Sequence, residues 1–229
     1  MKKVLISVVL IFMLSSPSLG CIGARQAAMG WAGVAISDDA TVSYWNPANI
    51  WAKDGFYWEN FGERTALAIK QSNYGFHYVD EWDKTYWRLS YGNKTSNNSA
   101  FGISVGWEEY HGYFSDYKGP SADISYIYKK DHFTYAILAQ NIGNIRPTIA
   151  YQNNFITITT SIYDIFNLCP LRHFQTGIEV TPIPFISFRG GYNGFYEIFT
   201  YGIGVKTSFM SLDLVHLFNE NHYSITLFY

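Results

Sequence analysis

From about residue 55 to its last residue, the chain repeats apolar side chains at every second position. The clearest example runs from Phe101 to Glu108, where large apolar residues alternate with glycine, serine and glutamate. Because successive side chains of a β-strand point to opposite faces, such a segment has one apolar face and one small or polar face. The chain after residue 55 is therefore expected to be all-β. The same alternation recurs in four other segments: 122–128, 133–140, 201–206 and 223–229.

Turn-forming pairs such as Gly92-Asn93 and Asn193-Gly194 separate the segments, as hairpin connections do. The segments 65–71 and 73–80 are interpreted as one bent strand. The stretches 110–120 and 142–152 are interpreted as long loops, and loops are where binding function is most often found. The predicted strands lie at 55–62, 65–71, 73–80, 85–93, 99–109, 121–129, 132–141, 153–163, 172–181, 184–191, 197–207, 209–216 and 221–229.

The residue types on the face opposite the apolar one distinguish two architectures, a soluble sheet and a membrane barrel. A soluble sheet presents Lys and Glu to water, whereas here small and uncharged residues predominate. Charged residues make up 15% of the chain, against about 25% in an average soluble domain. Aromatic residues reach 19%, as in membrane barrels with interfacial aromatic girdles. Strands span hydrocarbon only as a closed barrel, because every backbone polar group there needs a partner.

The sequence therefore favours an all-β fold, a closed antiparallel transmembrane β-barrel. Merging the bent pair gives about 12 strands (range 10–14), since even numbers are usual in bacterial barrels. The alternative is a secreted soluble β-protein with an aromatic binding groove. Membrane lipid is the expected surrounding. A nucleic-acid partner is not expected, because 16 Lys and Arg face 18 Asp and Glu.

Residues 1–20 have the order of a secretory signal peptide: two lysines, an apolar run over 4–14, and small residues before the cut. Export to the outer membrane of a Gram-negative-type bacterium is expected. The last strand ends on Tyr229 after regular alternation, which resembles the C-terminal assembly signal of bacterial outer-membrane barrels. The sequence leaves open whether Cys21 is lipidated or pairs with Cys169.

Residues 22–50 differ from the rest, being rich in Ala and Gly, and are expected to form a compact irregular segment that packs against something larger. They carry four motifs in order: Gly-Ala-Arg at 23–25, Met-Gly at 29–30, Asp-Asp-Ala at 38–40 and Asn-Pro-Ala at 46–48. In order and spacing these resemble the N-terminal segment of the FadL/PorV superfamily of outer-membrane barrels. The stretch 188–193 resembles that family's RAGY turn.

The resemblance implies three parts: a signal peptide at 1–20, a plug or hatch segment at 21–52 inside the lumen, and the barrel at 53–229. It also implies function. Long-chain fatty-acid transporters of this superfamily have 14 strands and release hydrophobic solutes sideways into the membrane, whereas PorV-type members are partners in type IX secretion. This chain is shorter than typical members, so 12 strands with short loops are expected.

Two functions follow as hypotheses. The first is a barrel that binds or passes a small hydrophobic solute through a plugged lumen. The alternative is a non-transporting outer-membrane scaffold that docks a secreted or periplasmic partner protein, through an exposed aromatic loop face around 110–118.

Charged residues in the plug and on the polar faces are the candidate site residues. Arg25, Asp38 and Asp39 are the plug charges, and an Arg25–Asp contact inside the lumen is expected because buried charges need partners. Asn46 and Pro47 are expected to form a turn between plug and first strand. The lumen-facing candidates are Arg88, Glu108, Asp123, Glu179, Lys206 and Asp213.

Signals of catalysis are missing from the sequence. Six histidines are scattered without a close pair, and no metal-ligand spacing occurs. No Gly-x-Ser-x-Gly elbow and no phosphate-binding glycine loop stands in a suitable setting. A protein that is not an enzyme and has no metal or cofactor is therefore expected.

Overall fold

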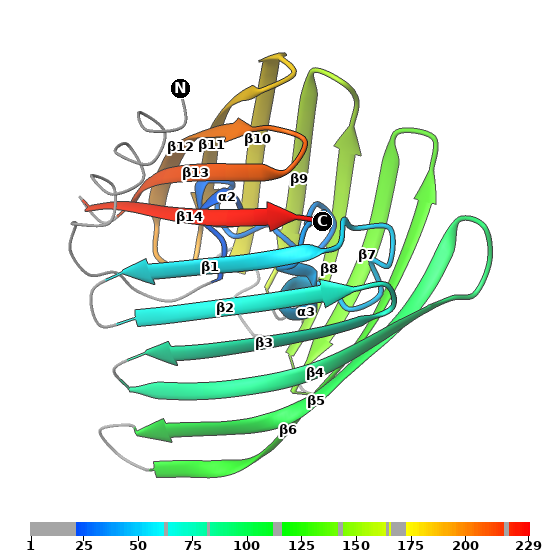
Figure 1. The fold of residues 1–229 in the computed structure, drawn as a ribbon, viewed down its shortest axis with the longest axis vertical. Coiled ribbons are helices and arrows are strands. Elements are labelled where there is room, and N and C mark those ends of the chain that lie inside the picture. The colour runs from blue at the N-terminus through cyan, green and yellow to red at the C-terminus, as the bar shows by residue number, and fades with distance from the viewer. Residues whose placement is uncertain are drawn as a thin grey trace.

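In a computed structural model of the protein, fourteen antiparallel strands form a closed barrel (Figure 1). The structure describes residues 22–61, 64–81, 83–111, 116–141, 144–163, 165, 173–217 and 220–229. The expected signal peptide and the two cysteines lie outside these residues. Each strand pairs with the next, and β1 pairs with β14 through Gly55 opposite Phe228, which closes the barrel.

The strands are β1 (Gly55–Phe61), β2 (Arg64–Gln71), β3 (Tyr74–Glu81), β4 (Lys84–Lys94), β5 (Ser99–His111), β6 (Asp116–Lys130), β7 (Phe133–Gln140), β8 (Asn144–Gln152), β9 (Ile156–Ile162), β10 (Phe174–Ile183), β11 (Ile186–Asn193), β12 (Ile198–Lys206), β13 (Met210–Leu217) and β14 (Glu220–Phe228). The closed antiparallel barrel confirms the expected fold class.

The strand number exceeds the expected twelve by two and stands at the top of the range. β2 and β3 are separate strands, with Lys70 opposite Gly75. The stretch 144–152, expected to be a loop, is strand β8. The long loop expected at 110–120 is mostly strand, because β5 runs to His111 and β6 starts at Asp116. Short strands and short connections let fourteen strands fit this chain length.

Large apolar side chains cover the outside of the barrel, and small or polar ones face inward. Along β5, Val105 is 53% exposed, whereas Ser104 is 1% exposed and Glu108 is 7% exposed. A continuous exposed apolar surface on this scale is not stable in water and suits hydrocarbon. The period-two pattern therefore predicted the inner and outer faces correctly. Among the described residues, no helix is long and apolar enough to cross a membrane.

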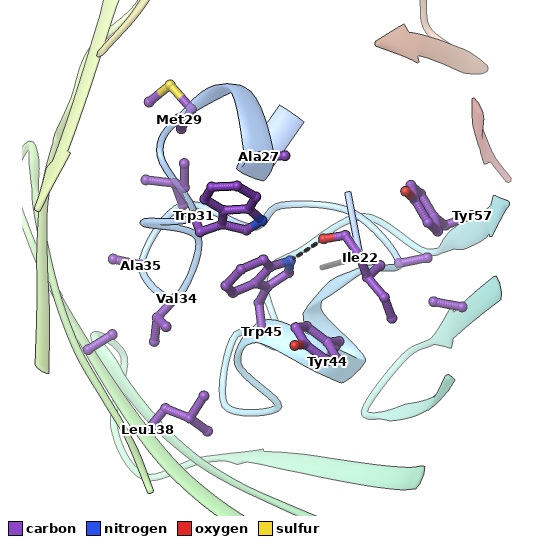
Figure 2. Packing of buried hydrophobic residues seen from close by; sticks show 14 of the residues in the cluster. Ile22, Ala27, Met29, Trp31, Val34, Ala35, Tyr44, Trp45, Tyr57 and Leu138 are labelled. Atoms are coloured by element: carbon purple, nitrogen blue, oxygen red, sulfur yellow. Dashed lines mark hydrogen bonds between the residues drawn. The ribbon is translucent and has the colours of Figure 1, made fainter. Parts of the chain in front are cut away.

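Residues 22–54, here called the inner segment, lie inside the barrel (blue in Figure 1). They include two short helices, α2 (Ala24–Ala28) and α3 (Val42–Trp45). The hydrophobic core is built here, from aromatic and aliphatic side chains of the inner segment and small wall residues such as Ala66 and Ala136. Figure 2 shows Trp45 at its centre, where Nε1 donates a hydrogen bond of 2.8 Å to the Ile22 carbonyl.

Glycines bring the inner segment against the barrel wall. A Cβ on Gly191 of β11 would collide with the backbone nitrogen of Gly30, and one on Gly102 of β5 would collide with that of Ala48. Gly30 itself has a φ of 65°, which a side chain would strain. Backbone-to-backbone contact therefore fixes the inner segment at two opposite stretches of wall.

One end of the barrel, here called the terminal end, holds the start of β1 and the end of β14. The connections at this end are short, as between β2 and β3 or between β6 and β7. The other end, here called the loop end, includes the longer connection between Ile162 and Phe174. Short turns are typical of the periplasmic end of bacterial barrels.

Strand β6 extends past its neighbour β7 at the loop end. β6 pairs with β5 from Asp116 to Tyr128. Its described pairing with β7 runs only from Ile124 to Lys130. The first half of β6 therefore stands beside a step in the rim of the barrel.

Candidate functional site

A cavity of about 710 Å³ lies at this step, on the loop-end side of β4, β5 and β6. Its lining comes from both faces of the wall: some of its residues point to the lumen and others to the outside. We call it the side cavity. It is lined by Lys84, Val105, Gly106, Glu108, Tyr110, Pro120, Ser121, Ala122 and Asn141.

The lumen side of the cavity is an ion-pair network. Lys84 Nζ lies 2.5 Å from Glu108 Oε1. Glu108 Oε2 accepts hydrogen bonds from Asn141 Nδ2 at 3.2 Å and from Arg88 Nη2 at 3.4 Å. Arg88 also donates to Asp123 Oδ2 at 2.6 Å. Two cations and two carboxylates thus balance each other in a largely buried cluster.

Asn141 completes this network from a turn. Its side-chain oxygen accepts a hydrogen bond of 2.9 Å from Arg88 Nη2, and its backbone N–H donates to Asp123 Oδ1 at 2.9 Å. Its φ is 49°, a left-handed conformation that Asn adopts more readily than most residues. The turn after β7 therefore serves to place an amide beside Glu108.

The outer side of the cavity is apolar. Val105 of β5 is exposed on the outer face, and its partner across the strand pair is Ala122 of β6. Pro120 lies two positions before Ala122 and thus on the same face. Pro120 has no backbone N–H, so the first half of β6 leaves one fewer unpaired donor at the step. A molecule in the cavity would meet charge on one side and hydrocarbon-like surface on the other.

Sequence reasoning identified part of this cluster. Arg88, Glu108 and Asp123 were expected to face the lumen, and the structure brings all three together. Lys84 and Asn141 were missed. Lys84 lies four positions before Arg88 and thus on the same face of the strand, which was a usable signal, whereas Asn141 lay beside a presumed loop.

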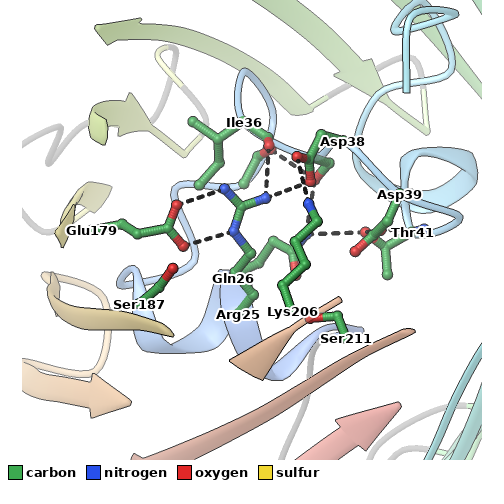
Figure 3. Close-up of polar contacts among 12 residues, drawn as sticks. Arg25, Gln26, Ile36, Asp38, Asp39, Thr41, Glu179, Ser187, Lys206 and Ser211 are labelled. Carbon is green, nitrogen blue, oxygen red and sulfur yellow. Dashed lines mark hydrogen bonds and ion pairs between the residues drawn. The ribbon is translucent and has the colours of Figure 1, made fainter. Parts of the chain in front are cut away.

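A second cluster, here called the inner network, ties the inner segment to the opposite wall (Figure 3). Arg25 Nε and Nη2 donate to the two carboxylate oxygens of Glu179 at 2.9 and 2.8 Å, and Nη1 donates to Asp38 at 2.6 Å. Lys206 Nζ lies 3.3 Å from the other Asp38 oxygen. Arg189 Nε donates to Glu179 at 2.6 Å.

The expected Arg25–Asp contact is thus made with Asp38, while Glu179 and Lys206 join it from β10 and β12. Burial would raise the pKa of Asp38, but the charges of Arg25 and Lys206 outweigh it and hold that pKa below its usual value. Asp213 also joins, because Arg189 Nη1 donates to it at 2.6 Å.

Asp39 serves the inner segment itself. Its carboxylate accepts hydrogen bonds from the backbone N–H of Thr41 at 2.8 Å and from the Thr41 hydroxyl at 2.5 Å. Burial and the neighbouring charge of Asp38 raise the pKa of Asp39, and the Thr41 hydrogen bonds oppose this. The structure therefore places Asp39 at the start of α3, facing its own turn.

Asn46 and Pro47 lie at the end of α3, before Ala48 contacts the wall. Asn46 Nδ2 donates to the Val34 carbonyl at 2.9 Å, and its Oδ1 accepts from the Ala48 N–H at 3.1 Å. The turn lies within the inner segment, because residues 49–54 still separate it from β1. Within the part of the chain that the structure describes, no group of three or more His, Cys, Asp or Glu residues is placed to hold a metal ion.

Comparisons with known proteins place the fold. No family model and no curated protein matches the sequence. Among solved structures, the toluene transporter TbuX of Ralstonia pickettii has a TM-score of 0.61 at 11% identity, over 91% of this chain and 98% of that chain. The toluene transporter TodX of Pseudomonas putida has a TM-score of 0.54 at 11% identity, over 93% of this chain and 97% of that chain. The chain therefore has the fold of these two transporters, a closed antiparallel β-barrel as expected from its sequence.

Proposed function

We propose that this protein resides in the outer membrane of a Gram-negative-type bacterium and passes a small hydrophobic solute through the side of its barrel. The observation that carries the proposal is the side cavity, which has lining residues on both faces of the wall. The two transporters of similar fold support the same class of function and favour a transporter over an enzyme.

The arrangement of the lumen supports a sideways route. The inner segment is buried along nearly its whole length from Ile22 to Ile50 and packs against wall strands on both sides of the barrel. A straight aqueous path along the barrel axis would have to displace this core. At the step beside β6, by contrast, space reaches the lumen face without crossing the inner segment.

The chemistry of the outer wall supports a hydrophobic cargo. Outside the cavity the barrel presents exposed apolar side chains such as Val105 and Ile124. A solute leaving there enters hydrocarbon, so an apolar molecule gains free energy by burial, roughly 25 cal/mol per Å² of apolar surface. A polar solute would lose its hydration at the same point.

The test is to fill the cavity. Ala122→Trp places a large side chain among the lining residues. The control, Ile203→Trp, introduces the same side chain at an exposed position on β12, away from the cavity. Both variants are expressed in a Gram-negative host, and uptake of radiolabelled toluene is measured. Folding is checked by the gel shift that membrane barrels show on boiling.

The expected result is a loss of most protein-dependent toluene uptake in Ala122→Trp, with uptake retained in Ile203→Trp and the gel shift retained in both. Unchanged uptake in a folded Ala122→Trp barrel would contradict the sideways route. A protein found in the soluble fraction would contradict the membrane location as well.

A further inference from the structure

We propose that the side cavity is selective for a neutral amphipathic solute with a hydrogen-bonding head, such as a phenol, over a plain hydrocarbon and over a carboxylate. This inference rests on the proposed function and narrows its solute class. The juxtaposition behind it is one cavity lined both by polar residues of the lumen face, Lys84, Glu108 and Asn141, and by apolar residues of the outer face.

The polar wall offers hydrogen bonds to a solute head. The side chain of Lys84 is 32% exposed, although it is paired with Glu108. An ammonium group has three donors and a carboxylate accepts several hydrogen bonds. A hydroxyl both donates and accepts, so it can hydrogen-bond to this pair without breaking it.

A hydrocarbon of the same size lacks this option. It would remove water from Lys84 and Glu108 and leave their remaining hydrogen-bonding capacity unused, which is costly for buried polar groups. Sites built around a hydroxyl discriminate strongly against analogues that lack it. The cavity should therefore prefer the hydroxylated molecule.

Charge balance disfavours ions. Lys84 and Arg88 are compensated by Glu108 and Asp123 within the cluster. A carboxylate solute would bring an uncompensated charge next to two buried carboxylates, and burying an unpaired charge is expensive. The favoured head is therefore polar but uncharged.

The apolar wall sets the orientation of the solute. Val105, Pro120 and Ala122 lie on the outer side of the cavity, on the strand face opposite that of Glu108. A phenol would place its hydroxyl at the lumen wall and its ring on the outer side, toward the membrane. The same orientation keeps an apolar ring leading into the hydrocarbon on exit.

The experiment uses three probes of one shape, 4-methylphenol, p-xylene and 4-methylbenzoate, which differ only in the group opposite the methyl. Binding to the purified full-length barrel in detergent is measured by calorimetry. Each titration is repeated with Ala122→Trp, whose blocked cavity gives the background from partition into micelles. Three further variants complete the set: Lys84→Met, Lys84→Arg, and Lys118→Met as a matched control.

Lys118 of β6 is the matched control because it forms a similar pair, 2.7 Å from Glu109 of β5, but outside the cavity. The expected result is at least about tenfold tighter binding of 4-methylphenol than of either other probe, the effect of about one hydrogen bond to a charged group. Lys84→Met should remove most of this preference, whereas Lys84→Arg and Lys118→Met should keep it.

Equal binding of phenol and xylene, tightest binding of the benzoate, or an unchanged preference in Lys84→Met would overturn the selectivity. Those outcomes leave the sideways route standing as long as Ala122→Trp still abolishes toluene uptake. If none of the three probes binds above the Ala122→Trp background, the selectivity also fails. Only unchanged uptake in the folded Ala122→Trp barrel overturns the route itself.

Discussion

Replacing Arg25 by methionine tests whether the inner network holds the inner segment in the barrel. The Arg25 side chain is 11% exposed and makes three charge-assisted hydrogen bonds, two to Glu179 and one to Asp38. Methionine keeps much of the length and apolar contact of the arginine stem but none of its donors. The substitution therefore isolates the charged contacts.

The magnitude follows from what the two carboxylates retain. Removing one partner of a buried ion pair costs about 3–5 kcal/mol when the other charge is left alone. Here Glu179 keeps Arg189 at 2.6 Å, and the half-exposed Asp38 keeps Lys206 at 3.3 Å. We therefore expect the free energy of unfolding to fall by about 3 kcal/mol, the lower end of that range.

The assay is urea unfolding of the purified barrel in detergent micelles, read by tryptophan fluorescence and analysed by linear extrapolation. Limited proteolysis in native conditions reports separately on the inner segment, which should become cleavable between residues 22 and 50 while the barrel still shifts on boiling. The control is Lys118→Met, in an exposed pair with side chains 65% and 34% accessible, expected to cost less than about 1 kcal/mol. A loss in Arg25→Met no larger than this control, with no new cleavage, would refute the reasoning.

Two further predictions concern the same segment. Gly191→Val should cost about 1–3 kcal/mol or more through overpacking, because its Cβ would meet the backbone of Gly30, whereas Gly190→Val meets nothing nearer than 4.0 Å and should be nearly neutral in the same urea assay. Because the pKa of Asp38 is held below its usual value, its carboxylate should stabilise the fold above the unfolded pKa of about 3.9 and lose that contribution as the pH falls through the folded pKa. Unfolding midpoints between pH 7 and pH 3 should therefore fall less steeply in Asp38→Asn, and equal slopes would contradict the assigned ion pairs.

The alternation of apolar and polar side chains was enough to predict most of the fold. Every second residue of a strand points to the same face, so the pattern shows which side chains face the lumen. That is why Arg88, Glu108 and Asp123 could be placed on the polar face from sequence alone. The number of strands was harder to predict from the sequence. In β8 the alternation is present, with Ile149 outside and Thr148 inside, but Pro147 within the strand suggested a loop.

The wrong prediction that β2 and β3 form one bent strand has a different cause. β2 and β3 are joined at Ser72, whose φ is 55°. A left-handed conformation at serine is uncommon, and Ser72-Asn73 is a weaker hairpin signal than Asn-Gly or Asp-Gly. The side cavity could not be predicted for a further reason: it depends on how far β6 extends past β7, which is a matter of pairing register between strands.

The two charged clusters lie on different sides of the barrel and hold different parts of it. The inner network joins the inner segment, through Arg25 and Asp38, to strands β10 and β12. In the described residues, the ion pairs of the side cavity join wall residues only, on β4, β5 and β6. A solute can therefore exchange hydrogen bonds at Lys84 and Glu108 without disturbing the contacts that retain the inner segment. The proposed passage through the side cavity would therefore not require the inner segment to leave the barrel. For this reason the proposed route and the stability of the inner segment should respond to separate substitutions.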